Sequence, residues 1–181
     1  VTHNSGKSSM AMYIVAQVQK QKGKALWIDM EAAMSTEYAK KIGVDVDKLI
    51  ISQPVSGEEG LDIVEKMVPT GEFDVVVIDS VAALVPQKEL DGEISDVTMA
   101  LQARMMSRHL RVITSIAAKT KTCIIYINQT RDNIMAFGYG NKTITTGGKA
   151  LRFYASVRLE VKIINKIKVD ESICGNHLKI T

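Results

Sequence analysis

The stretch FDVVVIDS, residues 73–80, is a near-continuous run of β-branched residues that is followed by an acid, Asp79, and a serine. Such a run suits a strand that is buried on both faces, as the strands of a parallel sheet are. Two similar apolar runs, ALWID (residues 25–29) and TCIIYINQ (residues 122–129), also end in polar residues. The three stretches therefore predict a parallel sheet whose strands finish in chemically useful side chains.

Helical patterns alternate with these strands along the chain. Apolar residues at helical spacing predict helices over residues 10–21, 36–42, 57–68 and 97–119, and LIIS (residues 49–52) predicts a further strand. Gly23 and Gly43 stand where the first two helices should be capped. This alternation predicts an α/β fold with a mostly parallel, twisted sheet and helices on both faces. The length of 181 residues fits a single domain, residues 1–181.

The composition is that of a soluble globular protein. A net charge of +3 permits an anionic partner without requiring one. No apolar stretch reaches the roughly 18 residues of a membrane span and no signal peptide is visible, so we expect a cytoplasmic protein with no membrane partner. Cys123 lies in an apolar run, which favours a buried free thiol over a disulfide with Cys174.

The chain opens with VTHNSGKSS, residues 1–9, whose SGKS portion has the form of a phosphate-binding loop before a helix. Taken alone, a helix cap with a solvent-facing lysine explains it equally well. Coupled to the strand that ends in Asp79, it favours a nucleotide site, with Lys7 at the outer phosphates and with Ser8 and Asp79 holding Mg²⁺. The other predicted nucleotide-binding residues of this stretch are Asn4, Ser5, Gly6 and Ser9.

Polar residues at the strand ends supply candidate chemistry beside that loop. Glu31 can orient the water that attacks a phosphate, and the amide of Gln129 can contact both a γ-phosphate and the loop that follows. The spacing leaves open whether Asp29 and Asn128 are functional or only hold the local structure.

Two features predict contact with DNA. Arg104, Ser107 and Arg111 share one face of the long helix, although a merely solvated face would show the same spacing. The stretch RDNIMAFGYGNKTITTGGK, residues 131–149, is too long and glycine-rich for a simple connection. It mixes cations with apolar and aromatic side chains, a combination that suits single-strand binding without sequence preference. Its predicted DNA contacts are Arg131, Phe137, Gly147 and Gly148.

Several longer stretches resemble the bacterial RecA recombinase core in the same order, namely WIDMEAAM, YAKKIGVDVDKLIISQP, VVVIDSVAALVP, LQARMMSRHLR, INQTR and TTGGKALRFYASVRLE. The resemblance implies a P-loop ATPase fold and an ATP-dependent strand-exchange activity. By position, Glu31 matches the catalytic glutamate of that family, Gln129 its γ-phosphate sensor and Tyr38 the residue that stacks on adenine. Residues 91–99 match the first DNA-binding loop, and residues 128–146 include the second.

The resemblance also implies cofactors and partners. These are ATP and Mg²⁺, single-stranded and double-stranded DNA, and self-association of the full-length protein into a helical filament during DNA repair and the SOS response. It runs from about residue 4 to about residue 160, and residues 155–181 match less securely. Val1 stands where the family has a glycine, and Ser35 where it usually has an acid. We interpret the chain as one core truncated at both ends.

Two other functional classes remain open on the sequence. One is a different RecA-like ATPase, such as a ring helicase or a recombination mediator, against which the aromatic and basic loop before TTGG argues. The other is a DNA-binding fragment that keeps the fold but does not hydrolyse ATP. A strand-exchange assay distinguishes the first class from a recombinase, because a helicase or mediator does not exchange strands. A measurement of ATP turnover distinguishes the second class, which does not hydrolyse ATP.

Overall fold

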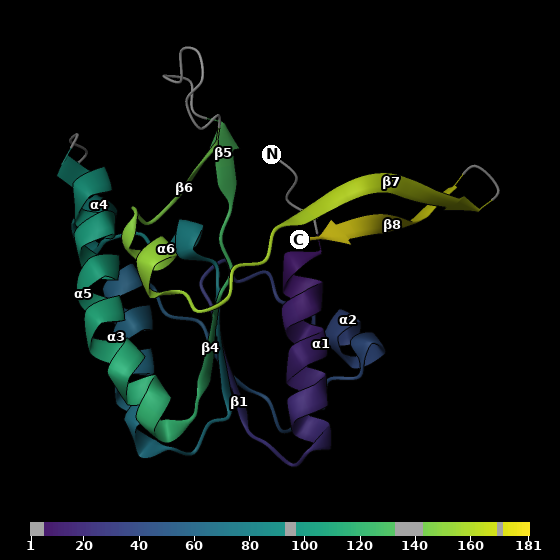
Figure 1. Ribbon diagram of the computed structural model, residues 1–181, viewed down its shortest axis with the longest axis horizontal. Coiled ribbons are helices and arrows are strands. Elements are labelled where there is room, and N and C mark those ends of the chain that lie inside the picture. Colours follow the sequence, from purple (N-terminus) through teal and green to yellow (C-terminus); the bar gives the residue numbers. More distant parts are fainter. Residues whose placement is uncertain (1–5, 93–96, 133–142, 170–171) are drawn as a thin grey trace.

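The computed structural model describes residues 6–92, 97–132, 143–169 and 172–181, and its architecture is α/β (Figure 1). Four parallel strands form the central sheet in the order β2–β1–β3–β4. Their bounds are β1 (Ala25–Asp29), β2 (Ile50–Ser52), β3 (Val75–Asp79) and β4 (Cys123–Tyr126). The predicted parallel sheet is therefore confirmed, and β1 and β3 are its most deeply buried strands.

Helices cover both faces of this sheet (Figure 1). One face is covered by α1 (Lys7–Lys20) and α2 (Thr36–Ile42), and the other by α3 (Gly57–Met67) and α5 (Val97–Thr120). Side chains alternate along a strand, so Trp27 of β1 packs with the α1 cluster, while Leu26 and Ile28 pack with the α3 and α5 cluster. The sheet thus separates two apolar cores.

The helix ends follow local sequence signals, with one difference from expectation. Ser35 caps α2 by accepting a hydrogen bond from the backbone N–H of Tyr38 at 3.2 Å, and Gly43 ends it with φ of 104°. After α1 the left-handed residue is Lys22, with φ of 66°, rather than the predicted Gly23. Gly23 instead donates its N–H to the Val18 carbonyl at 2.9 Å, where a Cβ would meet the Val18 side chain.

Shorter elements complete the described structure. The helical ones are η1 (Val68–Thr70), η2 (Val81–Ala83), α4 (Gln87–Leu90) and α6 (Ala150–Tyr154). Two antiparallel ribbons that the sequence did not predict pair β5 (Thr130–Asp132) with β6 (Thr143–Thr145), and β7 (Val161–Val169) with β8 (Ser172–Ile180). The second ribbon lies beside the start of α1 (Figure 1).

Strand β4 is less buried than its sequence predicts. Its residues are exposed or half-buried, and Cys123 is a free but exposed thiol. The prediction of a buried thiol was therefore wrong. The physical reason is the strand order, because β4 lies at an edge of the described sheet and has a strand neighbour on one side only.

Candidate functional site

The carboxyl ends of β1 and β3 lie side by side and bring two acids together. Asp29 and Asp79 are register partners, and the backbone N–H of Met30 donates to the Asp79 carbonyl at 2.8 Å. Ligands of open α/β sheets bind beyond this edge. The described chain therefore presents its candidate chemistry where the fold favours a ligand.

The first turn of α1 faces the same edge. Gly6 precedes the helix with φ of 82°, and a Cβ on it would stand 2.5 Å from Leu178 Cδ1. The left-handed backbone favours glycine here, and any larger residue would also displace the Leu178 side chain of β8. Lys7 and Ser8 then open the helix, whose first turn presents backbone N–H groups and positive dipole to an anion.

Asp79 has the most perturbed acidity in this region. Burial is the main cause that raises its pKa to about 6; the nearby Glu31 and Asp29 carboxylates add to the rise, while a hydrogen bond from Ser8 and the charge of Lys7 oppose it. Asp79 thus lies near two other carboxylates and beside the Ser8 hydroxyl at the start of α1. Such a site favours a bound cation, since a cation would stabilise the ionised form of Asp79.

The oxygen donors around Asp79 fit Mg²⁺. A carboxylate and a hydroxyl are the hard ligands that Mg²⁺ takes, usually one or two from the protein, with water and phosphate completing its shell. Ser8 and Asp79 supply such a pair. Among the described residues no group of three or more His, Cys, Asp and Glu side chains could hold a metal.

Asp29 holds the local structure. It is 2% exposed, and its carboxylate accepts hydrogen bonds from the backbone N–H groups of Ala33 and Met34, both at 3.2 Å, and from Gln53 Nε2 at 3.0 Å. These bonds fix the turn after β1. The structure therefore favours the structural role that the sequence left open.

Glu31, which follows β1, is hydrogen-bonded to residues that follow β3 and β4. Its Oε1 accepts a hydrogen bond from Ser80 Oγ at 2.5 Å and another from Gln129 Nε2 at 3.3 Å. The side chain is otherwise exposed, so its second oxygen can reach water. The structure thus brings together Glu31 and Gln129, two residues singled out for phosphate chemistry.

Asn128 joins β4 to the segment after β6. Its Oδ1 accepts from the Gln129 N–H at 2.8 Å and from Thr146 Oγ1 at 2.6 Å, and its Nδ2 donates to the Thr146 carbonyl at 3.0 Å. All of these bonds are internal to the chain. These bonds support the structural role of Asn128, one of the two roles that the sequence left open.

Tyr38 lies on α2 beside the start of α1. It is 46% exposed, and its hydroxyl lies 3.0 Å from Ser9 Oγ. The ring is therefore available to a planar ligand, while its hydroxyl is held near the residues that follow Lys7. Ser35, which replaces an expected acid, caps the helix that carries this ring.

The predicted DNA residues of α5 lie on its solvent side. Arg104, Ser107 and Arg111 are exposed, whereas the core side of the helix carries Met106 and Leu110. This arrangement agrees both with DNA contact and with a solvated face.

The two glycines after β6 pack against neighbouring elements. Gly147 and Gly148 have φ of 80° and 78°. A Cβ would stand 2.7 Å from Val81 Cγ1 in the first case and 2.9 Å from Ala103 Cβ in the second. Close packing against η2 and α5 is therefore a reason for glycine at both positions, in addition to the predicted approach of a phosphate.

Comparison with known proteins identifies the family. The model of the RecA N-terminal domain matches residues 2–181. The chain belongs to the RecA family. The match extends to the end of the chain and so includes residues 155–181, for which the motifs alone gave less support.

Individual RecA relatives agree. The chain is 51% identical over 176 residues to Protein RecA of Nitratiruptor sp., a comparison that covers 97% of the chain and 51% of the relative. It is 50% identical to Protein RecA of Chlorobium limicola and 49% identical to that of Lactobacillus delbrueckii subsp. bulgaricus, each over 98% of the chain and 50% and 53% of the relative. The chain thus spans about half the length of these curated relatives.

Some of the predicted site residues lie outside the described part of the structure. These are Asn4, Ser5 and Phe137, together with Val1 at the first glycine position of the loop. Arg131 lies on β5, where its backbone pairs with Ile144 of β6. Within the described residues no helix is long and apolar enough to cross a membrane.

The structure adds Ser80 and Thr146 to the residues that organise this RecA site. Ser80 holds Glu31, and Thr146 holds Asn128. The sequence placed Ser80 at a strand end but carried no signal for its partner, which lies 49 residues away. Thr146 directly precedes the two glycines, and that position was its only signal.

Proposed function

We propose that the chain is the nucleotide-binding and DNA-binding core of a RecA recombinase, a DNA-dependent ATPase that promotes strand exchange in DNA repair. The observation that carries the proposal is the contact of Glu31 with both Ser80 and Gln129. It supports a site in which the group that orients water and the group that senses phosphate act as one unit. We propose a cytoplasmic location and a role in the SOS response on the same family basis.

Binding of ATP uses the start of α1 and the edge of β3. Lys7 contacts the outer phosphates as a point charge, and the first backbone N–H groups of α1 surround them. Ser8 and Asp79 hold Mg²⁺, which neutralises phosphate charge when bound. Tyr38 stacks on adenine, and its contact with Ser9 is what supports this orientation.

Hydrolysis uses the carboxylate of Glu31. While Oε1 is held by Ser80 and Gln129, the exposed remainder of the carboxylate orients a water for attack on the γ-phosphorus and accepts its proton. The bond from that phosphorus to the oxygen bridging to the β-phosphate breaks, and ADP leaves. Gln129 cannot take a proton, so its part is to report the presence of the γ-phosphate. The side-chain amide has two N–H groups, of which one donates to Glu31 and the other can donate to that phosphate.

DNA binding follows from the continuation of β4 into the aromatic and basic loop. Arg104, Ser107, Arg111 and Arg131 contact phosphates of single-stranded and double-stranded DNA, and Phe137 stacks on bases. Gln129 directly precedes β5, so a change in its phosphate contact changes the start of that loop. In a full-length protein these subunits associate into a helical filament on DNA.

A chimaera tests the proposal directly. Residues 2–181 replace the matching segment of Protein RecA from Nitratiruptor sp., which supplies the flanking half of the relative. We expect ATP turnover that rises with single-stranded DNA, together with exchange of strands between homologous duplexes. A matched chimaera with Glu31→Gln should bind ATP and DNA but exchange strands poorly.

The outcomes separate the competing classes. ATP turnover without strand exchange would instead identify a helicase-like or mediator ATPase. DNA binding without turnover in the unmodified chimaera would identify a non-hydrolysing module. Turnover that ignores DNA would contradict the proposed role of Gln129.

A further inference from the structure

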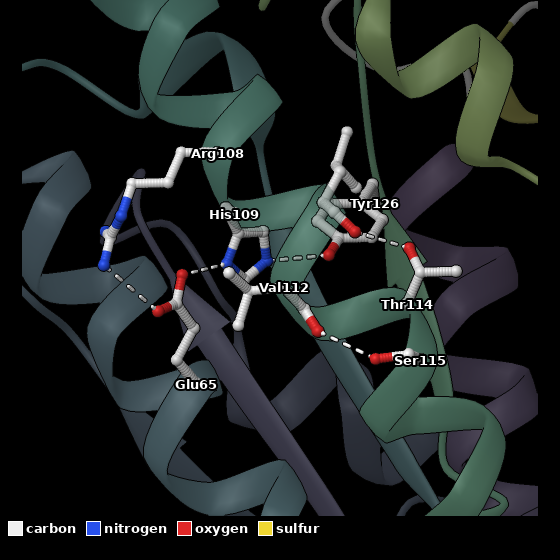
Figure 2. Close-up of polar contacts among 8 residues, drawn as sticks. Glu65, Arg108, His109, Val112, Thr114, Ser115 and Tyr126 are labelled. Carbon is white, nitrogen blue, oxygen red and sulfur yellow. Dashed lines mark hydrogen bonds and ion pairs between the residues drawn. The ribbon is translucent and has the colours of Figure 1, made fainter.

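A buried polar chain joins α3, α5 and β4 on the face of the sheet opposite α1 (Figure 2). His109 of α5 is 1% exposed and lies between two partners. Its Nδ1 is 3.0 Å from Glu65 Oε1, and its Nε2 is 2.8 Å from Tyr126 Oη. Arg108 approaches the other oxygen of Glu65 at 3.8 Å from the solvent side.

The donors and acceptors of this chain fix the proton positions. An ionised Glu65 only accepts, so the hydrogen of a neutral His109 must be on Nδ1. Nε2 is then an acceptor and takes the hydrogen of the Tyr126 hydroxyl. Burial, together with the charge of Glu65, raises the pKa of Tyr126, which therefore remains protonated and able to donate. With neutral His109, the atoms that link Glu65, His109 and Tyr126 all have a hydrogen-bond partner.

Protonation of His109 breaks this pattern. Nε2 would become a donor, and the Tyr126 hydrogen would lose its acceptor, because the described structure gives that hydroxyl no second partner. Tyr126 is half-buried as a whole, but burial is the main cause of its raised pKa, so its hydroxyl lies away from water and would be costly to leave without an acceptor. Burial lowers the pKa of His109, and the Arg108 charge lowers it further, while the hydrogen bond and charge of Glu65 oppose this effect.

The hydrogen-bonded side chains of Glu65, His109 and Tyr126 link elements inside the fold and do not form a second ligand site. The adjoining cavity of about 360 Å³ is lined by four carboxylates of α3, each of which already has a partner within the molecule. Glu58 accepts from the Gln87 N–H, Glu59 from the Val55 N–H, Asp62 pairs with Lys66, and Glu65 pairs with His109. Tyr126 does not line the cavity, and its raised pKa makes it a poor nucleophile.

We propose that Glu65, His109 and Tyr126 form a proton-controlled lock between α5 and β4, closed while His109 is neutral and loosened when it gains a proton. The lock joins two functional elements of the proposed site, since α5 carries Arg104 and Arg111 and Tyr126 lies three residues before Gln129. Its consequence for DNA binding rests on the proposed function, but the lock itself does not. Acidification should therefore loosen α5 from β4.

The first test uses the 181-residue chain without nucleotide or DNA. His109→Gln keeps an amide donor for Glu65 and a carbonyl acceptor for Tyr126 but cannot titrate. Below about pH 6.5 the unfolded wild type binds a proton at His109 more readily than the folded state does. Its unfolding equilibrium constant should therefore rise by up to about tenfold for each pH unit of acidification. The ratio of wild type to His109→Gln, measured by urea unfolding between pH 8 and 5, isolates this effect.

Controls remove other titrating groups from the comparison. Asp79 titrates near pH 6 with the opposite sign, and it cancels in the ratio because both proteins carry it. His177→Gln removes an exposed histidine of β8 and should follow the wild type. Parallel pH profiles for wild type and His109→Gln would overturn the lock.

A second measurement does not depend on the variant folding. Nitrogen chemical shifts of the His109 ring in the wild-type chain should show the hydrogen on Nδ1 and a pKa below the ordinary 6.5. Amide exchange in β4 and the facing turns of α5, corrected for its intrinsic pH dependence, should accelerate on acidification relative to α1. A pKa at or above 6.5, or uniform exchange, would overturn the proposal.

The functional consequence has its own readout. Affinity for a short single-stranded oligonucleotide at pH 6 and pH 7.5 should fall more in the wild type than in His109→Gln. If neither protein binds DNA at any pH, the proposed function fails while the unfolding and chemical-shift results still decide the lock. If both bind and respond equally to pH, the lock does not reach the DNA-binding elements.

Discussion

Gln129 Nε2 donates a hydrogen bond to Glu31 Oε1 at 3.3 Å, although the two residues are 98 positions apart in the chain. Ser80 Oγ donates to the same oxygen at 2.5 Å. One carboxylate oxygen therefore connects the ends of β1, β3 and β4. A displacement of the segment after β4 would change the hydrogen bonding of Glu31, which links the proposed DNA-binding loop to the proposed nucleotide site.

The first prediction concerns Glu31. Glu31→Gln should keep nucleotide affinity but lower ATP turnover by about two orders of magnitude, because the amide cannot accept a proton from water. Nucleotide affinity from equilibrium titration and turnover from phosphate release should be measured on the same preparation. Glu37→Gln, at an exposed acid of α2, is the matched control. An equal loss of affinity would make Glu31 part of the metal or structural shell.

Lys7→Ala should abolish ATP hydrolysis while the protein still folds. Lys7 opens α1 directly after Gly6, where its charge would meet the β- and γ-phosphate oxygens. Circular dichroism and cooperative urea unfolding check the fold, and Lys20→Ala at the far end of the same helix is the control. Undiminished turnover in Lys7→Ala would contradict the phosphate role.

Asp79→Asn should stabilise the nucleotide-free chain above pH 6. The folded pKa of about 6 exceeds the ordinary 3.8, so the stability gained from the bound proton is complete below about pH 3.8 and is lost as the pH rises through 6. At pH 8 the gain in unfolding free energy should be roughly 1–2 kcal/mol, since each pKa unit corresponds to about 1.4 kcal/mol and the carboxyl keeps some solvent contact.

Urea unfolding at pH 8, 6 and 4 measures this gain, which should shrink toward zero at the lowest pH. The same variant should lose the additional thermal stabilisation that Mg²⁺ and ATP give the wild type. Equal stability of the two proteins at pH 8 would show that the ionised Asp79 carboxylate does not destabilise the nucleotide-free fold. A preserved response to Mg²⁺ would remove it from the metal site.

Arg104→Ala and Arg111→Ala should weaken binding to all single-stranded sequences alike. Each lost phosphate contact should flatten the slope of log affinity against log salt by about 0.7. Lys119→Ala is the matched control, because Lys119 is a cation in the last turn of the same helix. Short oligonucleotides at fixed protein concentration avoid the amplification of a filament. Wild-type slopes in both variants would show that this face is only solvated.

Phe137→Ala should behave differently from the arginine variants. If its ring stacks on bases, roughly 1–3 kcal/mol of binding free energy is lost with the salt slope unchanged. Phe153→Ala, at an aromatic residue of α6 that is 83% exposed, serves as the control. Unchanged affinity in Phe137→Ala would confine DNA contact to the cations.

Much of the fold follows from local patterns in the sequence. The β-branched run before Asp79 and the helical spacing around Leu61 and Val64 each gave an element close to its observed bounds. These patterns work because burial on both faces of a strand, or on one side of a helix, selects residue types directly. The ends of the strands likewise marked the edge where the candidate site lies.

What the sequence did not show depends on contacts between distant segments. The exposure of Cys123 follows from strand order, which no local pattern encodes. The hydrogen bond from Ser80 to Glu31 spans 49 residues, and the contact of His109 with Glu65 spans 44. The ribbon of β7 and β8 exposes several of its apolar residues, so it lacks the burial alternation that reveals a strand.

The separation of the two apolar cores by the sheet has a consequence for how this protein can change over time. Val15 packs in one cluster and Leu110 in the other, and the two clusters share no buried residue. Effects of substitutions without common partners usually add. Substitutions in one core should therefore add to those in the other without depending on them, so each half of the interior can change separately.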